Sequence, residues 1–526
     1  MIAAIVACIA LIQPAPVKKV LVIGIDGCRP DALARAATPN IDRLVSEGCY
    51  AVGKADPLTV SGPCWSTVLC GVWAGKHGVR DNSFVGANYG EYPDFVTLLE
   101  RARPELQTVV VTSWSPIAEQ IVATADYEGP KLGKGDEAAV YEVRSQLRHQ
   151  EPDVVFVHFD APDYAGHTFG YGLDVPEYIK SIEETDAHIG AIMAQVRDRN
   201  AYSREEWLVI VTSDHGGTGK GHGLPIPEHM EVPFIVSGPS AAGSFGVVPT
   251  LCDVAPTVFA FLGIAPGPEV DWDGVPVGLK GVDSKALSDV RDRRKVEFDP
   301  PGGLVVGQKT VRMLVAEPGL EIMFTVDATL PKAGSMKAGG VVVSAETLVR
   351  ARAFKDGKPV GPSSAAHYRV QARYLSGLAA RPPEAGLRYR FVEGDFKSVD
   401  DAKFSSPSRQ GVAGRPSERV GGASEGFALE YTGYVHVEEE GVYQFGLYCD
   451  DGARLSIGDL TVVDHDGLHG ASMKTGLVAL RAGWHALRIV YFQSGGEAAL
   501  NLAMGKQGAA MEELGSSRFA HRRTGP

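Results

Sequence analysis

The first half of the chain alternates between short apolar runs and longer amphipathic stretches. The runs at residues 17–25, 153–159 and 208–212 are rich in β-branched side chains and do not alternate between apolar and polar positions. Such runs are typical of strands buried on both faces of a parallel sheet. Residues 175–199 instead repeat apolar side chains at helical spacing. Because strand and helix alternate to about residue 265, the pattern predicts an α/β fold, with a parallel sheet covered by helices on both faces.

Several shorter elements are expected between these landmarks. The pattern predicts helices near residues 38–47, 95–102 and 137–148, and a further strand at 106–112. Residues 58–82 are expected to be rich in loops.

The pattern changes in the second half of the chain, where short β-type runs are separated by Gly and Pro. One break lies between about residues 285 and 302, and a second lies at 378–385. We therefore predict an α/β domain at residues 17–290, followed by two all-β sandwich domains at 301–372 and 384–512.

The N-terminus carries an apolar stretch at residues 2–12, the length of a signal-peptide core and too short for a membrane helix. We predict a signal peptide at residues 1–16 and an exported protein that is periplasmic, at the cell surface or secreted. No transmembrane anchor is expected beyond this signal or a lipid.

Charge and cysteine usage narrow the function classes. The net charge of −13 argues against binding a nucleic-acid duplex through its phosphates. A small anionic substrate remains compatible, because a local pair of dications outweighs a diffuse surface charge. The seven cysteines are scattered without a C-x-x-C pair, so we expect small buried hydrophobes rather than a disulfide framework.

Carboxylates and imidazoles gather where three of the predicted strands end. The residues are Asp26, Asp163, His167, Asp214, His215 and His222. One sheet edge could collect all six, because the carboxyl ends of parallel strands face the same side. Taken singly, each has a structural alternative, such as a helix cap at Asp26 or ordinary loop positions at Asp163 and His167. Together they are the ligand types that two adjacent divalent metals require.

On the motifs D-x-x-G-H at residues 163–167 and D-H-G at 214–216, residues 18–280 resemble the alkaline phosphatase superfamily, and within it the type I phosphodiesterase and nucleotide pyrophosphatase branch. The resemblance implies an alkaline-phosphatase-like sheet and two metal sites. It implies that Asp26, Ser61, Asp214 and His215 hold one metal. It implies that Asp163, His167 and His222 hold the other, with His229 as the weaker alternative to His222. Zn²⁺ or Mn²⁺ would fit these ligands.

The resemblance also selects a nucleophile. The family's nucleophile stands two residues before a proline, sixteen before His-Gly and twenty-one before a phosphate-binding asparagine. Ser61 alone fits this register, with Pro63, His77 and Asn82 at those positions. The neighbouring hydroxyls are those of Thr59, Ser66 and Thr67. We expect Ser66 and Thr67 to begin the helix behind the loop.

Two departures refine the implied reaction. Position 65 is Trp rather than the arginine that sulfatases need, which disfavours sulfatase chemistry. The loop at residues 112–117 has no cation for a dianionic monoester, and Trp114 would suit the second substituent of a diester. We predict a hydrolase of phosphodiester or pyrophosphate bonds that works through a phosphoserine, with Ser61 and Asn82 as catalytic residues. The alternatives are a phosphomonoesterase and a carbohydrate-binding surface protein whose phosphatase-like domain is a scaffold.

The C-terminal half carries two further resemblances. Residues 301–372 look like the β module appended to chitobiases. Residues 386–504, with their Y-T-G-Y run at 431–434, resemble the protective-antigen fourteen-kilodalton module. That module implies binding of extracellular glycans, and in its lectin members an Asp-Asp pair matching Asp450 and Asp451 coordinates Ca²⁺. An Asp- and Gly-rich turn explains the same residues equally well.

Overall fold

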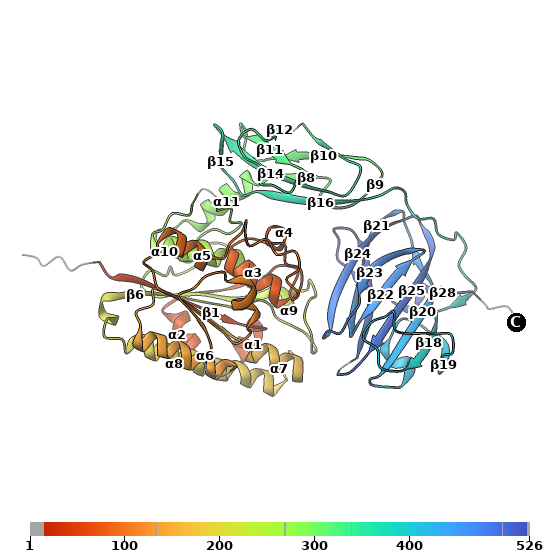
Figure 1. Cartoon of the computed structure of the whole chain (residues 1–526), viewed down its shortest axis with the longest axis horizontal. Coiled ribbons are helices and arrows are strands. Elements are labelled where there is room, and N and C mark those ends of the chain that lie inside the picture. The colour runs from red at the N-terminus through yellow and green to blue at the C-terminus, as the bar shows by residue number, and fades with distance from the viewer. Residues whose placement is uncertain (1–14, 132–133, 268–269, 338, 497, 523–526) are drawn as a thin grey trace, which may run out of the picture. The chain divides into compact units, whose positions relative to one another are not determined.

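The computed structural model describes residues 15–131, 134–267, 270–337, 339–496 and 498–522. The predicted signal-peptide core at residues 2–12 lies outside the described residues. Contacts divide the chain into two compact units (Figure 1). The first unit is Met1–Gly219 with Pro225–Leu287, and the second is Ser288–Pro526 with the short segment Lys220–Leu224.

The first unit is built on a seven-stranded sheet within its described residues, in the order β2-β7-β6-β1-β5-β3-β4. The strands are β1 (Val17–Ile25), β2 (Gly48–Lys54), β3 (Thr108–Thr112), β4 (Tyr127–Gly129), β5 (Val154–Phe159), β6 (Glu205–Thr212) and β7 (Glu231–Ser237). The pairings β6-β1-β5-β3-β4 are parallel, whereas β7 and then β2 join antiparallel at one edge. The predicted parallel sheet is confirmed in its centre, and the antiparallel edge is an addition that mixed α/β sheets commonly carry.

Helices cover both faces of this sheet (Figure 1). They are α1 (Pro30–Arg35), α2 (Pro39–Ser46), α3 (Ser61–Cys70), α4 (Ala74–His77), α5 (Phe95–Ala102), α6 (Asp136–His149), α7 (Ala161–Phe169), α8 (Pro176–Arg197), α9 (Pro227–Met230) and α10 (Val254–Leu262), with α11 (Ser284–Arg294) at the boundary of the unit. Leu21, Ile23 and Ile25 of β1 share one hydrophobic cluster with α2, α6 and α8. Because side chains alternate along a strand, Gly24 faces the other side, where α3 and α10 pack.

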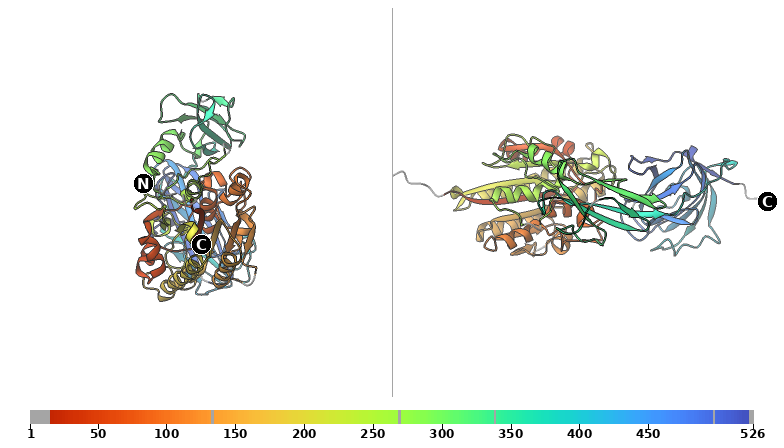
Figure 2. Two further views of the ribbon diagram at one scale, coloured as in Figure 1. Left: turned by 90° about the vertical axis from the view of Figure 1, so that its left-hand side faces the viewer. Right: turned by 90° about the horizontal axis from the view of Figure 1, so that it is seen from above.

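The second unit consists mainly of β-strands, coloured green to blue in Figure 2. Its described part begins with two sheets, β13-β10-β8 and β12-β11-β14-β16-β9, with β15 pairing β14. The bounds are β8 (Glu297–Asp299), β9 (Gly303–Val306), β10 (Lys309–Leu314), β11 (Glu321–Thr325), β12 (Met336–Lys337), β13 (Val341–Val343), β14 (Thr347–Lys355), β15 (Lys358–Pro359) and β16 (Ser364–Gln371). Val311 of one sheet and Val349 of the other belong to the same buried cluster, which makes this a small sandwich.

A larger sandwich follows, with sheets β17-β28-β20-β25-β22-β23 and β24-β21-β26-β27. The bounds are β17 (Glu384–Ala385), β18 (Leu387–Glu393), β19 (Arg409–Ala413), β20 (Phe427–Val437), β21 (Gly441–Asp450), β22 (Ala453–Ile457), β23 (Leu460–His465), β24 (Ser472–Leu480), β25 (Gly483–Gln493), β26 (Ala499–Lys506), β27 (Glu512–Glu513) and β28 (Phe519–His521). Leu429, Ile489, Phe445 and Leu502 bring both sheets into one core. The predicted succession of an α/β domain and β-sandwich regions is confirmed.

Two stretches expected to be loops are helical. Asp163 and His167 lie on α7, whose first turn is supported because the Asp136 carboxylate accepts hydrogen bonds from the backbone N–H groups of Asp160 (2.9 Å) and Ala161 (3.1 Å). Residues 61–70 form α3, so Ser66 lies in the middle of a helix rather than at its start. Every residue of α3 is buried. Its sequence therefore lacks the apolar–polar periodicity by which helices are recognised.

Within the described ranges, no helix combines the length and the apolar composition needed to cross a bilayer.

Candidate active site

Asp26 directly follows β1, and hydrogen bonds hold one of its two carboxylate oxygens. Its Oδ2 accepts hydrogen bonds from Trp65 Nε1 at 2.8 Å and from His158 Nε2 at 3.0 Å. Its Oδ1 is buried and has no hydrogen-bond partner in the described part of the chain. Burial lowers the pKa of His158 to about 3, so this imidazole is neutral and its Nε2–H is the donor. The two donors therefore hold Asp26 with Oδ1 presented to a further ligand.

Asp214 and His215 follow β6 and complete a buried group with Asp26. Asp214 Oδ1 accepts a hydrogen bond from the Gly27 backbone at 3.1 Å, and Asp214 Oδ2 has no partner among the described residues. His215 Nε2 lies 3.2 Å from Asp214 Oδ2 and 3.7 Å from Asp26 Oδ1. His215 Nδ1 lies 3.0 Å from the carbonyl oxygen of Gly216, which favours the tautomer with the proton on Nδ1. This arrangement directs the Nε2 lone pair toward the two carboxylate oxygens.

The electrostatics of this group call for a cation. Burial raises the pKa of Asp26 well above its usual value, and the charges of Asp214 and Asp163 raise it further. Burial and Asp163 likewise raise the pKa of Asp214. Two buried carboxylates with unsatisfied oxygens are costly unless a cation compensates them. Two carboxylates and an imidazole form a donor set that suits Zn²⁺ or Mn²⁺, so these residues fit a divalent metal.

Ser61 lies beside this group as the first residue of α3. Its Oγ is 3.3 Å from His215 Nε2. The following backbone N–H, that of Gly62, donates a hydrogen bond of 2.7 Å to Asn82 Oδ1. This bond uses the oxygen of the Asn82 amide. Because Asn82 is exposed, its NH₂ group can donate to a ligand.

The neighbouring hydroxyls have structural contacts instead. Ser66 Oγ donates to the carbonyl of Gly62 at 2.6 Å and lies 2.7 Å from Tyr89 Oη. Thr67 Oγ1 donates to the carbonyl of Pro63 at 3.1 Å. Both hydroxyls bond to the turn before them, as helix-interior Ser and Thr often do. Ser61, by contrast, places its hydroxyl within 3.3 Å of His215 Nε2 in the Asp26 group.

A second group contains Asp163, His167 and His222. Asp163 and His167 occupy positions i and i+4 of α7, with Asp163 Oδ2 3.3 Å from His167 Nε2. The potential ligand atoms of all three residues lie within 4.8 Å of one another. His229 instead places Nε2 2.8 Å from Thr218 Oγ1. This geometry favours His222 over His229.

Gly27 lets the two groups approach each other. It has a φ of +65°, and a Cβ added there would lie 2.7 Å from Asp163 Oδ1. Tyr171 donates its hydroxyl hydrogen to the same oxygen, which holds the carboxylate in place. A side chain at position 27 would therefore push α7 away from β1.

Phe84, two residues after Asn82 in the chain, forms an aromatic pair with Trp114. The rings of Phe84 and Trp114 have centroids 6.0 Å apart and are tilted by 34°. Phe84 adopts a left-handed φ of 56°, which is rare for a bulky residue and marks a constrained position. The predicted aromatic wall at Trp114 thus has a second ring.

The sequence reasoning missed Trp65 and His158. In the sequence, Trp65 indicates only the absence of an arginine, and His158 forms part of a predicted strand. A usable signal existed for His158, because an imidazole in an otherwise apolar run needs a buried partner. The contact between Trp65 and Asp26, 39 positions apart, has no comparable signal in the sequence.

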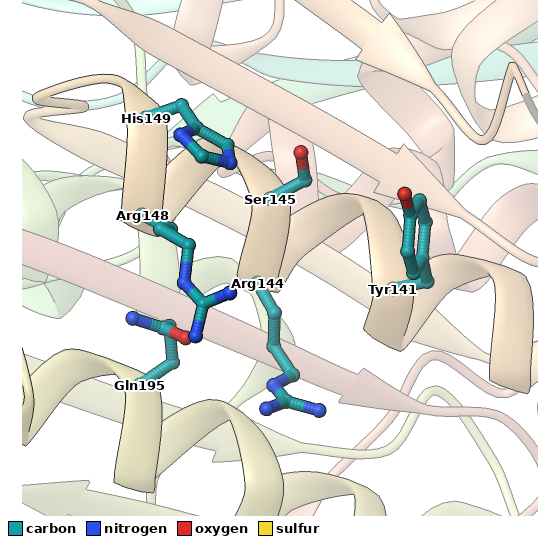
Figure 3. Close-up of a pocket in the computed structure, with 6 residues that line it drawn as sticks. All are labelled: Tyr141, Arg144, Ser145, Arg148, His149 and Gln195. Atoms are coloured by element: carbon teal, nitrogen blue, oxygen red, sulfur yellow. The ribbon is translucent and has the colours of Figure 1, made fainter.

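A separate hollow of about 180 Å³ lies between α6 and α8. Figure 3 shows Arg148 reaching from α6 toward Gln195 on α8. The lining residues are Tyr141, Arg144, Ser145, Arg148, His149 and Gln195. None of the predicted ligands or nucleophiles lines it, so it is distinct from the site around Ser61.

In the second unit, Asp450 ends β21 and Asp451 follows it. Asp451 Oδ1 accepts from the His469 backbone at 3.2 Å, and Oδ2 accepts from the Ser494 backbone at 2.8 Å. Calcium binding by this pair remains a prediction.

Two parts of the chain match models of known protein families. Residues 20–135 and 130–220 match the family model described as type I phosphodiesterase / nucleotide pyrophosphatase, and residues 383–517 match that of the PA14 domain. These matches confirm the predicted resemblances to the phosphodiesterase branch and to the protective-antigen module. The resemblance of residues 301–372 to the chitobiase module remains a prediction.

The individual relatives are similar over part of their length. Ectonucleotide pyrophosphatase/phosphodiesterase family member 7 of Rattus norvegicus is 24% identical over 225 residues, 38% of this chain and 50% of the relative. The 2,3-bisphosphoglycerate-independent phosphoglycerate mutase of Desulforudis audaxviator is 30% identical over 123 residues, 22% of each protein. A structure of murine ectonucleotide pyrophosphatase/phosphodiesterase 5, an inactive variant in complex with AMP, has a TM-score of 0.42 and 16% identity, covering 49% of this chain and 97% of that one. The chain thus spans between about a fifth and a half of these two curated relatives.

Proposed function

We propose that the first unit is a metal-dependent hydrolase of phosphodiester or pyrophosphate bonds. The observation that carries this proposal is the position of Ser61 Oγ, 3.3 Å from His215 Nε2. This imidazole lies next to Asp26 Oδ1 and Asp214 Oδ2, two buried oxygens without a hydrogen-bond partner among the described residues. A hydroxyl nucleophile next to a site built for a dication has the arrangement that covalent phosphoryl transfer requires. The family match over residues 20–220 supports the same reaction class.

In the proposed reaction, each residue of the site has a separate role. Ser61 Oγ attacks phosphorus, forming a P–O bond while the bond to the leaving oxygen breaks, and water then hydrolyses the phosphoseryl group. Asn82 donates from its amide to a non-bridging oxygen. Asp26, Asp214 and His215 would hold one metal and Asp163, His167 and His222 the other. Bound dications lower the pKa of a hydroxyl and offset phosphate charge.

A diester fits this site better than a monoester. The loop at residues 112–117 contains no Lys or Arg that could meet a second negative charge. Trp114, which is half-buried and packs against the buried ring of Phe84, instead offers an aromatic surface against which a planar substituent can pack. Phosphomonoester hydrolysis is the second candidate, because it uses the same nucleophile and metals.

The test compares initial rates on bis(4-nitrophenyl) phosphate and 4-nitrophenyl phosphate. The purified full chain is first stripped with chelator and then supplied separately with Zn²⁺ and Mn²⁺, with Ser61→Ala as the control. Diester hydrolysis that returns with metal and is absent in Ser61→Ala supports the proposal. Faster monoester hydrolysis would favour the phosphomonoesterase. No hydrolysis of either substrate by metal-loaded protein would favour the non-catalytic scaffold.

We further propose that the protein is exported and that its PA14 region, residues 383–517, binds extracellular glycans, with Asp450 and Asp451 contributing oxygens to Ca²⁺. The PA14 family match and the adjacent carboxylates support this assignment. A glycan array probed with the full chain, with and without Ca²⁺, tests it, and Asp450→Asn should reduce any calcium-dependent signal. Binding that ignores both Ca²⁺ and the substitution would contradict the calcium role.

A further inference from the structure

We propose a transition-metal site in the second unit, formed by Cys449, His465 and His469 and selective for Zn²⁺-type ions over Ca²⁺. The Cys449 Sγ and one ring nitrogen of each histidine lie within 4.8 Å of one another. A thiolate and two imidazoles are ligands that Zn²⁺ shares with few hard cations. This site shares no residue with the proposed phosphodiesterase centre.

The strand pairing brings these side chains together from three places. Cys449 lies near the end of β21, opposite Ser472 of β24 and Leu500 of β26. His465 is the last residue of β23, and His469 lies in the turn that leads to β24. The end of β21, the end of β23 and the turn before β24 therefore each contribute one ligand atom to the group.

The surroundings of Cys449 are not those of a cysteine that serves only as a small hydrophobe. The side chain is fully buried, yet two imidazoles, only partly buried, place nitrogens near its sulfur. His465 Nε2 is held 3.0 Å from Ser472 Oγ, as an outer hydrogen bond to a ligand imidazole would be. The partial exposure of the histidines gives an ion a route to the thiol.

The separations between the three ligand atoms can be compared with those around a bound Zn²⁺ ion. Zn–S and Zn–N bonds of about 2.3 and 2.0 Å in a tetrahedron separate the ligand atoms by about 3.3–3.6 Å. Because the three ligand atoms lie within 4.8 Å of one another, shifts of no more than about 1 Å would bring them to these separations. The imidazoles of His465 and His469 are stacked, with centroids 4.0 Å apart and planes inclined by 21°. Binding would splay these rings, release the thiol proton to solvent and leave the fourth position to water.

The neighbouring carboxylates of Asp450 and Asp451 favour a different class of metal ion from the Cys449 site. Asp451 directs its oxygens to the backbone N–H groups of His469 and Ser494. Oxygen ligands select hard cations such as Ca²⁺, whereas sulfur and nitrogen select Zn²⁺, Co²⁺ or Cu²⁺. A metal held by Cys449 would order the turn that carries His469 and so brace the Asp450–Asp451 segment.

Cobalt provides the direct test, because a thiolate bound to Co²⁺ gives a near-ultraviolet charge-transfer band. We expect this band when full-length protein is titrated with Co²⁺ in excess Ca²⁺, and we expect Zn²⁺ to remove it. Cys449→Ser should abolish the band and bind one metal equivalent less than the wild type. Cys28→Ser, which changes a buried thiol near Asp214, should keep the band.

His469→Asn provides a second test in case Cys449→Ser does not fold. A substitution at His469 should disturb the fold less, because His469 is partly exposed. This variant should bind Co²⁺ at least tenfold more weakly at the thiolate-dependent site. The proposal is overturned if the wild type shows no charge-transfer band, if the band survives Cys449→Ser, or if Ca²⁺ displaces Co²⁺ from it. These readouts do not require phosphodiesterase activity, so failure of the proposed function would leave them unchanged.

Discussion

Trp65 Nε1 donates a hydrogen bond of 2.8 Å to Asp26 Oδ2. This bond joins the helix that carries Ser61 to the residue that follows β1, which is a proposed metal ligand. The indole fits there because position 24 is glycine, since a Cβ on Gly24 would lie 2.4 Å from the Trp65 ring. The proposed nucleophile and the proposed ligand are therefore positioned by one buried contact. A change at Trp65 should affect metal binding without removing any ligand.

Trp65→Phe tests this link. The variant keeps a ring in the core but loses the donor to a buried carboxylate, which should cost about 1–3 kcal/mol of stability. We expect metal affinity and diester hydrolysis to fall by about 10–100-fold, as losses next to metal ligands typically do. Isothermal titration of the chelated protein with Zn²⁺ measures the affinity.

Trp272→Phe is the matched control. The ring of Trp272 also packs against another aromatic ring in the first unit. Its Nε1, however, is buried without a hydrogen-bond partner among the described residues. It should lose little metal affinity. Equal losses in the two variants would show that ring packing, rather than the bond to Asp26, matters.

Asp214→Asn removes a charge while keeping the shape of a proposed ligand. A neutral amide cannot offset the charge of a dication, so we expect metal content to fall and hydrolysis to drop by more than about 100-fold. Elemental analysis of the purified variant, together with rates at saturating Zn²⁺, measures both effects. Asp42→Asn, which changes an exposed carboxylate on α2, should behave like the wild type. Full activity of Asp214→Asn with normal metal content would remove Asp214 from the site.

The sequence was informative where chemistry leaves a local pattern. The buried strands were predictable from their β-branched runs, and parallel strand ends were enough to predict that Asp26, Asp214 and His215 meet. The helix α3 was missed because all its residues are buried, so its apolar and polar positions carry no period. The contact between Trp65 and Asp26 depends on packing between elements far apart in the chain, which local patterns do not encode.

Ser61→Ala separates the nucleophile from its neighbours. It should reduce hydrolysis by at least about 10³-fold, leaving only slow attack by water. Ser66→Ala should cost about 1 kcal/mol of stability through its bonds to Gly62 and Tyr89, with nearly normal turnover. Trapping with a slow substrate and mapping the phosphopeptide identifies the hydroxyl that is used. Label on Thr59 or Ser66 would overturn the assignment.

The last prediction concerns pH and follows from the raised pKa values of the buried carboxylates. Burial raises the pKa of Asp26 and Asp214, and burial with Asp163 raises that of Asp160 to about 7. For a carboxyl whose pKa is raised in the folded state, stability is fully present below the unfolded value of about 3.9 and is lost as pH rises through the folded value. The chelated protein should therefore lose stability at these sites between about pH 4 and neutral pH.

Bound metal reverses this trend, because ligand carboxylates must be ionised and proton competition fades as pH rises. We expect the Tm difference between metal-loaded and chelated protein to widen from about pH 5 to about pH 8, measured by differential scanning calorimetry in buffers of constant ionic strength. Other carboxylates, whose pKa values are lowered, contribute equally to the stability of both forms. Their contribution therefore cancels when the two forms are compared at the same pH. In Asp214→Asn the amide does not titrate. The chelated variant should therefore be more stable than the chelated wild type at the upper pH. The Tm difference between its metal-loaded and chelated forms should also be smaller. A Tm difference that stays constant across this range would mean that the buried carboxylates do not exchange protons for metal.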